Sequence, residues 1–262
     1  MDMTQKTTRE IFTVPNTGLP ENFIPGLPKT FSASGEIIHN ARNQIRVYDV
    51  NNQKVNVKKF CIPPIVNRIL YSWGWRIPKA KKTFLNAQKI VARGFQTPRP
   101  YGYIIERNGW MISFSYFISQ QVLGKKPIRE AGFDKDLIRA LARYTADLHQ
   151  KGLMHKDYTP GNILYSVENG KYDFWLVDIN RFRVQEKPIA LWLVVQNLMQ
   201  PFHEDEPLKF FVLEYAKVRG LSPKIYLPVW LIRHTRNCYD KTKRALKKLP
   251  GANLLLGKPL KK

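Results

Sequence analysis

Cysteine is nearly absent from this chain of 262 residues, which contains only Cys61 and Cys238. Two cysteines in a chain of this length do not make a disulfide framework, and the sequence has no C-x-x-C pair or His/Cys cluster of the kind that binds zinc. The composition therefore excludes a small extracellular domain held together by disulfides, and it fits a protein of a reducing compartment.

Long apolar runs are also missing. The most apolar stretch, residues 189–199, has about half the length that spans a bilayer, and Gln196 and Asn197 interrupt it. We expect a buried helix there. Residues 1–10 are polar and lack the apolar core of a secretory signal. These absences predict a cytoplasmic protein whose contact with a membrane is peripheral.

Acidic residues are few in comparison with basic ones. The chain has 43 Lys and Arg against 20 Asp and Glu, a formal net charge of +23. Such a surface attracts polyanions, and the candidates are nucleic acid, an acidic membrane and a phosphorylated ligand.

The first half of the chain has the patterns of a β-sheet with one helix. Several short segments are β-branched or alternate between apolar and polar residues, and Asn51-Asn52 is a typical hairpin turn. The predicted strands are residues 36–39, 44–50, 54–60, 101–106 and 110–118. Between them, residues 80–94 have apolar side chains at helical spacing and end in a glycine, which predicts a helix. Residues 1–30 contain closely spaced prolines and glycines, so we expect an extended leader there.

The second half of the chain changes character. Residues 134–150 form a strongly amphipathic helical pattern that Gly152 ends. A loop, a short strand at 175–177 and a mostly helical tail follow. We therefore predict an α+β fold with two lobes. Its parts are the leader 1–30, a small β-rich N-lobe 31–122 and a helical C-lobe 123–262.

The loop after the long helix carries the strongest motif. Residues 155–164 read H-x-D-x-x-x-x-N, the pattern of a kinase catalytic loop. In such a loop Asp157 orients the acceptor hydroxyl and takes up its proton, while Asn162 turns back to hold Mg²⁺. Pro160-Gly161 supplies the sharp turn between them. His155 is expected to brace the loop backbone.

Two further residues complete the predicted site. Asp178 follows an apolar strand at the position of the kinase D-F-G aspartate, a ligand of the Mg²⁺ that bridges the ATP phosphates. The triplet here is Asp-Ile-Asn and lacks the glycine. Lys58 ends a Val-Asn-Val-Lys segment that matches the strand lysine of kinases, which contacts the ATP phosphates. Lys59 should face the other side of the strand.

With these residues in place, the sequence resembles the bacterial lipopolysaccharide core kinases, the Kdo/heptose kinase family. The resemblance covers about residues 35–182 and is clearest at 94–100, 115–118, 155–164 and 177–181. It implies that the two lobes form a protein-kinase-like fold. It also implies an ATP- and Mg²⁺-dependent enzyme that phosphorylates a sugar hydroxyl, of Kdo or heptose, on an anionic acceptor linked to lipid A. It also implies that Asp157 is the base, that Asn162 and Asp178 are the Mg²⁺ ligands, and that Lys58 contacts ATP. The basic surface would then meet the acceptor at the cytoplasmic face of the inner membrane.

Two features of the kinase pattern are missing. No G-x-G-x-x-G segment occurs, so we expect the tip of the first hairpin, residues 39–43, to hold phosphate through its backbone amides, with Arg42 and Asn43 as contacts. The predicted helix has no acidic residue from 80 to 93 to pair with Lys58. Thr159 stands two residues after Asp157, where protein Ser/Thr kinases have a lysine, and no A-P-E segment follows Asp178. Both features argue against a protein kinase.

Three alternatives stay open beside a core-sugar kinase. The first is a small-molecule phosphotransferase, a class that uses the same H-x-D-x-x-x-x-N loop. A catalytically weak or dead scaffold at the membrane surface is a second alternative, with leucines 254–256 among basic residues as its lipid contact. The basic clusters 79–82 and 241–248 suggest a nucleic-acid-binding module, but we expect no nucleic acid partner because no fold signature accompanies them. The sequence does not indicate an oligomeric state.

Overall fold

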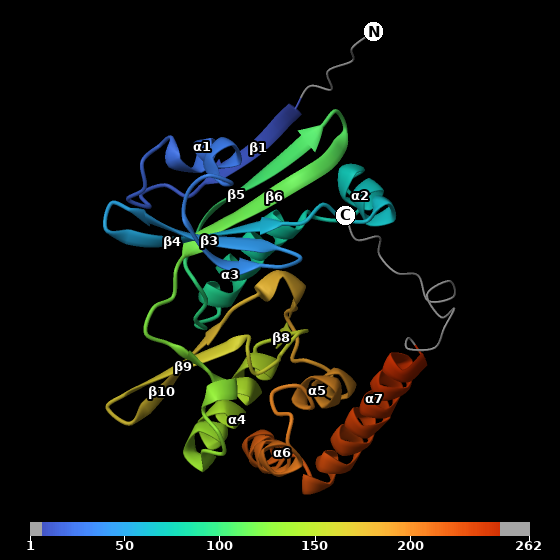
Figure 1. The fold of residues 1–262 in the computed structure, drawn as a ribbon. Helices are drawn as coiled ribbons and strands as arrows, with labels where there is room; N and C mark the ends of the chain where they lie inside the picture. The colour runs from blue at the N-terminus through green and yellow to red at the C-terminus, as the bar shows by residue number, and fades with distance from the viewer. Residues whose placement is uncertain (1–6, 247–262) are drawn as a thin grey trace.

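The computed structural model describes residues 7–246 of the chain. These residues form two lobes, a sheet-rich small lobe at the top of Figure 1 and a mostly helical large lobe below it. The chain passes from one to the other between the end of β6 at Gln120 and the start of β7 at Lys126. No helix within the described residues is long and apolar enough to cross a bilayer.

A single antiparallel sheet of six strands forms the small lobe, in the order β1-β5-β6-β4-β3-β2. The strands are β1 (Thr7–Thr13), β2 (Glu36–Asn40), β3 (Gln44–Val50), β4 (Gln53–Phe60), β5 (Pro100–Asn108) and β6 (Met111–Gln120). Asn51 and Asn52 join β3 to β4 with φ angles of 49° and 59°, the left-handed turn that an Asn-Asn hairpin favours. The five predicted strands are all present in this sheet.

The prediction of an extended leader is wrong for the described part of residues 1–30. Strand β1 pairs with β5 along its whole length, and helix α1 (Phe23–Thr30) buries Ile24 and Leu27 in the core of the lobe. All seven residues of β1 are exposed, as on an edge strand, so its sequence lacks the alternation that reveals a half-buried strand. Residues 1–6 lie outside the described part of the chain.

Helix α3 (Lys79–Ala92) lies between the sheet and the large lobe (Figure 1) and is the helix predicted at 80–94. Its buried residues include Phe84 against the sheet and Ile90 against the large lobe. A shorter helix, α2 (Ile65–Ser72), precedes it and was not expected. Two prolines before α2 and the Trp-Gly-Trp after it hid its pattern in the sequence.

The large lobe is built around α4 (Lys135–Gln150), the predicted amphipathic helix. Its N-cap residue Asp134 accepts hydrogen bonds from the backbone amides of residues 136 and 137. Helices α5 (Leu191–Leu198), α6 (Asp205–Arg219) and α7 (Tyr226–Leu246) complete the lobe. The expected buried helix at 189–199 is α5, although Leu191 and Trp192 are exposed.

Short strands support the loops between these helices. A three-stranded sheet contains β7 (Lys126–Pro127), β9 (Ile163–Glu168) and β10 (Lys171–Leu176), and a two-stranded one contains β8 (Leu153–His155) and β11 (Phe182–Val184). Only β10 had a counterpart in the sequence prediction. These short pairings hold the predicted catalytic loop on one side and Asp178 on the other.

Candidate active site

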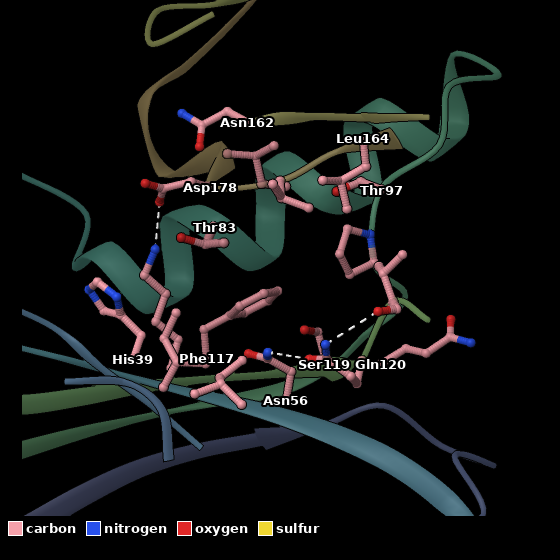
Figure 2. Close-up of a pocket in the computed structure, with 18 of the residues that line it drawn as sticks. His39, Asn56, Thr83, Thr97, Phe117, Ser119, Gln120, Asn162, Leu164 and Asp178 are labelled. Atoms are coloured by element: carbon pink, nitrogen blue, oxygen red, sulfur yellow. Dashed lines mark hydrogen bonds and ion pairs between the residues drawn. The ribbon is translucent and has the colours of Figure 1, made fainter. Parts of the chain in front are cut away.

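A cavity of about 520 Å³ lies between the two lobes and has the size of a ligand pocket. Its walls come from both lobes: Lys58 and Phe117 from the sheet, Leu164 and Asp178 from the large lobe, and Gln120 from the connection (Figure 2). The Lys58–Asp178 pair marks a charged end, and Phe117, Val122 and Leu164 supply apolar surface elsewhere in the lining. This arrangement suits a ligand with a flat apolar ring and a charged tail.

The loop that carries Asp157 is braced from below by His155. The Nε2 atom of His155 lies 2.9 Å from the carbonyl oxygen of Val177, and its Nδ1 accepts a hydrogen bond from the Asp157 backbone amide at 3.1 Å. Burial lowers the pKa of His155, so the ring is neutral and can donate at Nε2 while accepting at Nδ1. The expectation that this histidine braces the loop is confirmed.

A second buried histidine continues this support toward the helices. The side-chain amide of Asn197 donates to the His155 carbonyl oxygen at 2.8 Å, and its Oδ1 lies 3.0 Å from Nε2 of His149. The other nitrogen of His149 lies 2.9 Å from the hydroxyl of Tyr215. Burial lowers the pKa of His149 to about 4. The predicted catalytic loop is therefore tied to α4, α5 and α6 through neutral hydrogen bonds, a network that the sequence did not reveal.

Asn162 and Asp178 lie next to one another at the charged end of the cavity (Figure 2). The Nδ2 atom of Asn162 donates to the backbone oxygen of Asp157 at 2.9 Å, which leaves its Oδ1 free to accept or to bind a cation. Asp178 has a φ of 55° and a ψ of 43°, a left-handed conformation that is rare outside glycine and asparagine. Strained conformations of this kind often mark functional residues.

Lys58 reaches across the cleft to Asp178. Its Nζ lies 2.6 Å from Oδ1 of Asp178. In kinases the strand lysine pairs with a glutamate of the following helix, whereas in this structure Lys58 pairs with Asp178. The neighbouring helix instead contributes Asn86, whose amide donates to the Ile179 backbone oxygen at 2.7 Å. Lys59 faces the other side of the strand, as predicted, with its Nζ 3.9 Å from the centre of the Phe114 ring.

The tip of the first hairpin lies over the same end of the cleft. Asn43 lines the inter-lobe cavity and also a second one, and its Oδ1 accepts a hydrogen bond from the Cys61 amide at 3.3 Å. Arg42 lines the second cavity but not the inter-lobe cavity. Their roles as phosphate contacts stay a prediction.

The second cavity, of about 720 Å³, opens beside the first, and Asn43 and Asp178 line both. Asp157 lies in its wall. Basic side chains dominate the rest of the charged lining: Arg42, Arg76, Lys79, Lys82 and Arg181. We call this the basic cavity. Burial lowers the pKa of Lys79, as expected for a cation enclosed among other cations.

Arg181 was missed as a site residue by the sequence reasoning. Its Nη1 lies 3.2 Å from both carboxylate oxygens of Asp157. Its position three residues after Asp178 was the available signal, but only the fold shows that the chain turns back toward the catalytic loop there. Lys79 and Lys82 were noticed as a basic cluster, and their spacing of three places them on one face of α3.

The donor set at the charged end fits Mg²⁺ held against phosphates. No group of three or more His, Cys, Asp or Glu side chains able to hold a metal exists among the described residues. Magnesium in phosphate-transferring sites needs less, because it takes one or two protein oxygens and completes its shell with phosphate and water. The carboxylate of Asp178 and the free amide oxygen of Asn162 are such a pair.

This two-lobed fold, with its cleft and braced loop, is that of the protein-kinase-like phosphotransferases. A model of the lipopolysaccharide kinase (Kdo/WaaP) family matches residues 64–200, just over half of the chain, and the chain belongs to this family. The resemblance to the lipopolysaccharide core kinases noted in the sequence is thereby confirmed.

A solved structure agrees on the fold. A structure of WaaP in complex with acyl carrier protein superposes with a TM-score of 0.58 at 14% identity, covering 88% of this chain and 99% of that one. A Rio2 kinase–ADP/Mg²⁺–phosphoaspartate complex from Chaetomium thermophilum matches at a TM-score of 0.46 and 15% identity, covering 81% and 75% of the two chains. No curated protein sequence matches this chain. The predicted fold class, α+β with two kinase-like lobes, is confirmed.

Proposed function

We propose that this protein uses Mg²⁺ and ATP to phosphorylate a sugar hydroxyl, of Kdo or heptose, in the inner core of lipopolysaccharide. One observation carries the proposal: Asp157 lies in the wall of a basic cavity that meets the inter-lobe cleft at Asp178 and Asn43. A donor in the cleft and an acceptor in the basic cavity would therefore meet beside the catalytic loop.

The cleft residues have complementary roles toward the nucleotide. When bound, Mg²⁺·ATP supplies the phosphoryl group and a metal that offsets its charge. Asp178 and Asn162 would hold the metal, and Lys58 would hold the phosphates from the strand above. Arg42 and Asn43 would cover the phosphate end from the hairpin tip. Such preorganised charges provide most of the rate in phosphoryl transfer.

Asp157 is the proposed base. Its backbone is held by hydrogen bonds with His155 and Asn162, and its carboxylate is in contact with Arg181 in the wall of the basic cavity. It would accept the proton of the acceptor hydroxyl as the oxygen attacks the phosphoryl group. Arg181, in contact with both carboxylate oxygens, would orient the carboxylate and attract an anionic acceptor.

The acceptor class follows from charge. Five cationic side chains line the basic cavity together with Asp157 and Asp178, and the whole chain carries a net charge of +23. Inner-core sugars linked to lipid A are anionic, so this lining favours them over the cationic substrates of many small-molecule phosphotransferases. We place the reaction at the cytoplasmic face of the inner membrane, with peripheral contact between protein and lipid and with no nucleic acid partner.

The experiment is transfer of labelled γ-phosphate to Kdo-lipid A and to heptose-extended acceptors, with wild type beside Asp157→Ala. Wild type should label one of these glycolipids, and the variant should lose about 10²- to 10⁴-fold of the rate, as expected for a general base. Asp173→Ala is the matched control, because Asp173 is an exposed aspartate of β10 outside both cavities.

Three results would contradict the proposal or a part of it. Wild-type turnover in Asp157→Ala would remove this residue from the chemistry. A folded wild-type protein that binds no nucleotide would favour the catalytically inactive scaffold instead, and nucleotide binding without glycolipid labelling would point to a different acceptor.

A further inference from the structure

An exposed aromatic surface lies on the small lobe beside the basic cavity. Trp73, Trp75 and Trp110 have 60, 72 and 54% of their surface exposed. The ring of Trp73 lies 5.6 Å from that of Trp75 and 6.1 Å from that of Trp110. We call these three residues the tryptophan cluster. Contiguous exposed aromatic residues of this size mark a surface that meets another molecule.

Helix α2 extends this apolar surface. None of its eight residues is fully buried by the described part of the chain, and Ile65 and Val66 point to solvent. Polar contacts attach the helix to the sheet instead: Arg68 donates from Nε to the Ile112 oxygen at 2.6 Å, and the Ile112 amide donates to the Ser72 hydroxyl at 2.8 Å. The helix is thus held in place, and Tyr71 packs against the core of the small lobe, while the apolar side chains of its first turn, Ile65 and Val66, stay exposed.

The chain segment that carries most of this surface has charges of one sign only. No acidic residue occurs between Asp49 and Glu106, a stretch that contains α2, two members of the tryptophan cluster and α3. Arg76, Lys79 and Lys82 follow Trp75 directly along the chain and line the basic cavity. Exposed tryptophans next to cations suit the headgroup layer of an anionic bilayer, where the indole ring buries its apolar body and keeps its N–H hydrated.

We propose that the tryptophan cluster and α2 dock this protein on an anionic lipid bilayer. The docking surface is continuous with the site, because Trp75 and Ile77 belong to the exposed apolar surface and also line the basic cavity that holds Asp157. A headgroup at the bilayer surface can therefore enter the basic cavity while its acyl chains stay in the membrane. This inference rests on the peripheral lipid contact of the proposed function and assigns that contact to one surface, and lipid binding without nucleotide or sugar acceptor tests it separately from the phosphotransfer reaction.

The test is flotation of the full-length protein with vesicles of phosphatidylcholine, with and without phosphatidylglycerol. Wild type should bind the anionic vesicles, and added salt should weaken the binding. Trp73→Ala should weaken it about tenfold, the effect expected from withdrawing one large apolar side chain from lipid. Trp192→Ala is the matched control, because Trp192 is 61% exposed but belongs to α5 of the large lobe, and it should bind like wild type.

Thermal unfolding and nucleotide binding show whether each variant is folded, and Trp110→Ala provides a second test on the β5–β6 turn. The proposal is overturned if folded wild type stays unbound, or if Trp192→Ala loses as much binding as Trp73→Ala. It is also overturned if added salt weakens binding but Trp73→Ala and Trp110→Ala both bind like wild type. Loss of a self-associated form or of an acyl carrier protein complex in Trp73→Ala, with vesicle binding intact, would assign the surface to a protein partner.

Discussion

The ammonium group of Lys58 lies 2.6 Å from the carboxylate of Asp178, although the two residues are 120 positions apart in the sequence. Strand β4 of the small lobe is thereby joined to the large lobe across the cleft. Both groups are also the expected contacts of the nucleotide phosphates and their metal. Binding of the nucleotide would therefore insert new charges between two groups that already neutralise one another.

Lys58→Met should reduce kcat/KM for ATP about 10²-fold, the usual effect of removing one donor that stabilises developing charge. The control is Lys54→Met on the same strand. Lys54 forms an ion pair of the same length with Asp49, 2.6 Å, but lies outside both cavities. Steady-state kinetics with ATP as the varied substrate tests this prediction. Equal values of kcat/KM for the two variants would show that Lys58 does not contact the nucleotide.

Arg181→Gln should lower kcat/KM for the acceptor about tenfold while leaving KM for ATP unchanged. The Arg181 side chain is exposed and contacts Asp157, so its loss should alter the free energy of unfolding by less than about 1 kcal/mol. Arg183→Gln, two residues further on and outside both cavities, is the control. A loss confined to stability would show that the ion pair is only structural.

Lys82→Gln should raise KM for an anionic acceptor about fivefold, because a charge near a protein surface contributes about 1 kcal/mol to binding an anion. KM for ATP should change little. The effect should fade in high salt, since screening shortens the range of the interaction. Lys89→Gln on the same helix provides the comparison, because Lys89 is exposed and lines neither cavity. Identical acceptor kinetics in the two variants would place the acceptor elsewhere.

Acid should destabilise the protein partly through His149. Its ordinary pKa of 6.5 falls to about 4 in the folded state through burial, so between these values the unfolded chain binds a proton that the folded one does not. This contribution to stability is full above pH 6.5 and is lost as the pH falls toward 4, by on the order of 3 kcal/mol.

Denaturant unfolding of wild type and His149→Gln at several pH values tests this titration. The variant should lose part of the slope of unfolding free energy against pH, whereas His203→Gln, at an exposed histidine, should keep it. Parallel slopes in all three proteins would mean that His149 is protonated in the folded state as well.

Much of the candidate site could be proposed from the sequence because its residues belong to short motifs. Asp157 and Asn162 are in one loop, whose geometry depends on local spacing, and Asp178 follows an apolar strand. The contacts Arg181–Asp157 and Asn197–His155 could not be predicted, because they depend on how α5 and β11 fold back against the loop. The partner of Lys58 was unknown for the same reason.

The fold was predictable where a segment carried its own periodicity. Strands β3 and β4 and helices α3 and α4 alternate or repeat clearly. Strand β1 and helix α2 do not, because one is exposed on both faces and the other buries none of its residues completely and exposes Ile65 and Val66. Strands β8 and β11, of three residues each, are too short to show a pattern. The described structure ends before the basic and leucine-rich segment 247–262, so the role predicted for it lies outside the described residues.

The pairing of β1 with β5 affects how the chain folds during synthesis. Thr7 meets Asn108, 101 residues later, so the first strand waits without a partner while most of the small lobe is being made. Long-range pairings of this kind slow folding and leave a free strand edge exposed to other chains. Arg9 and Glu10 place charge in the middle of this strand, which hinders pairing with a neighbouring nascent chain until its own partner is available.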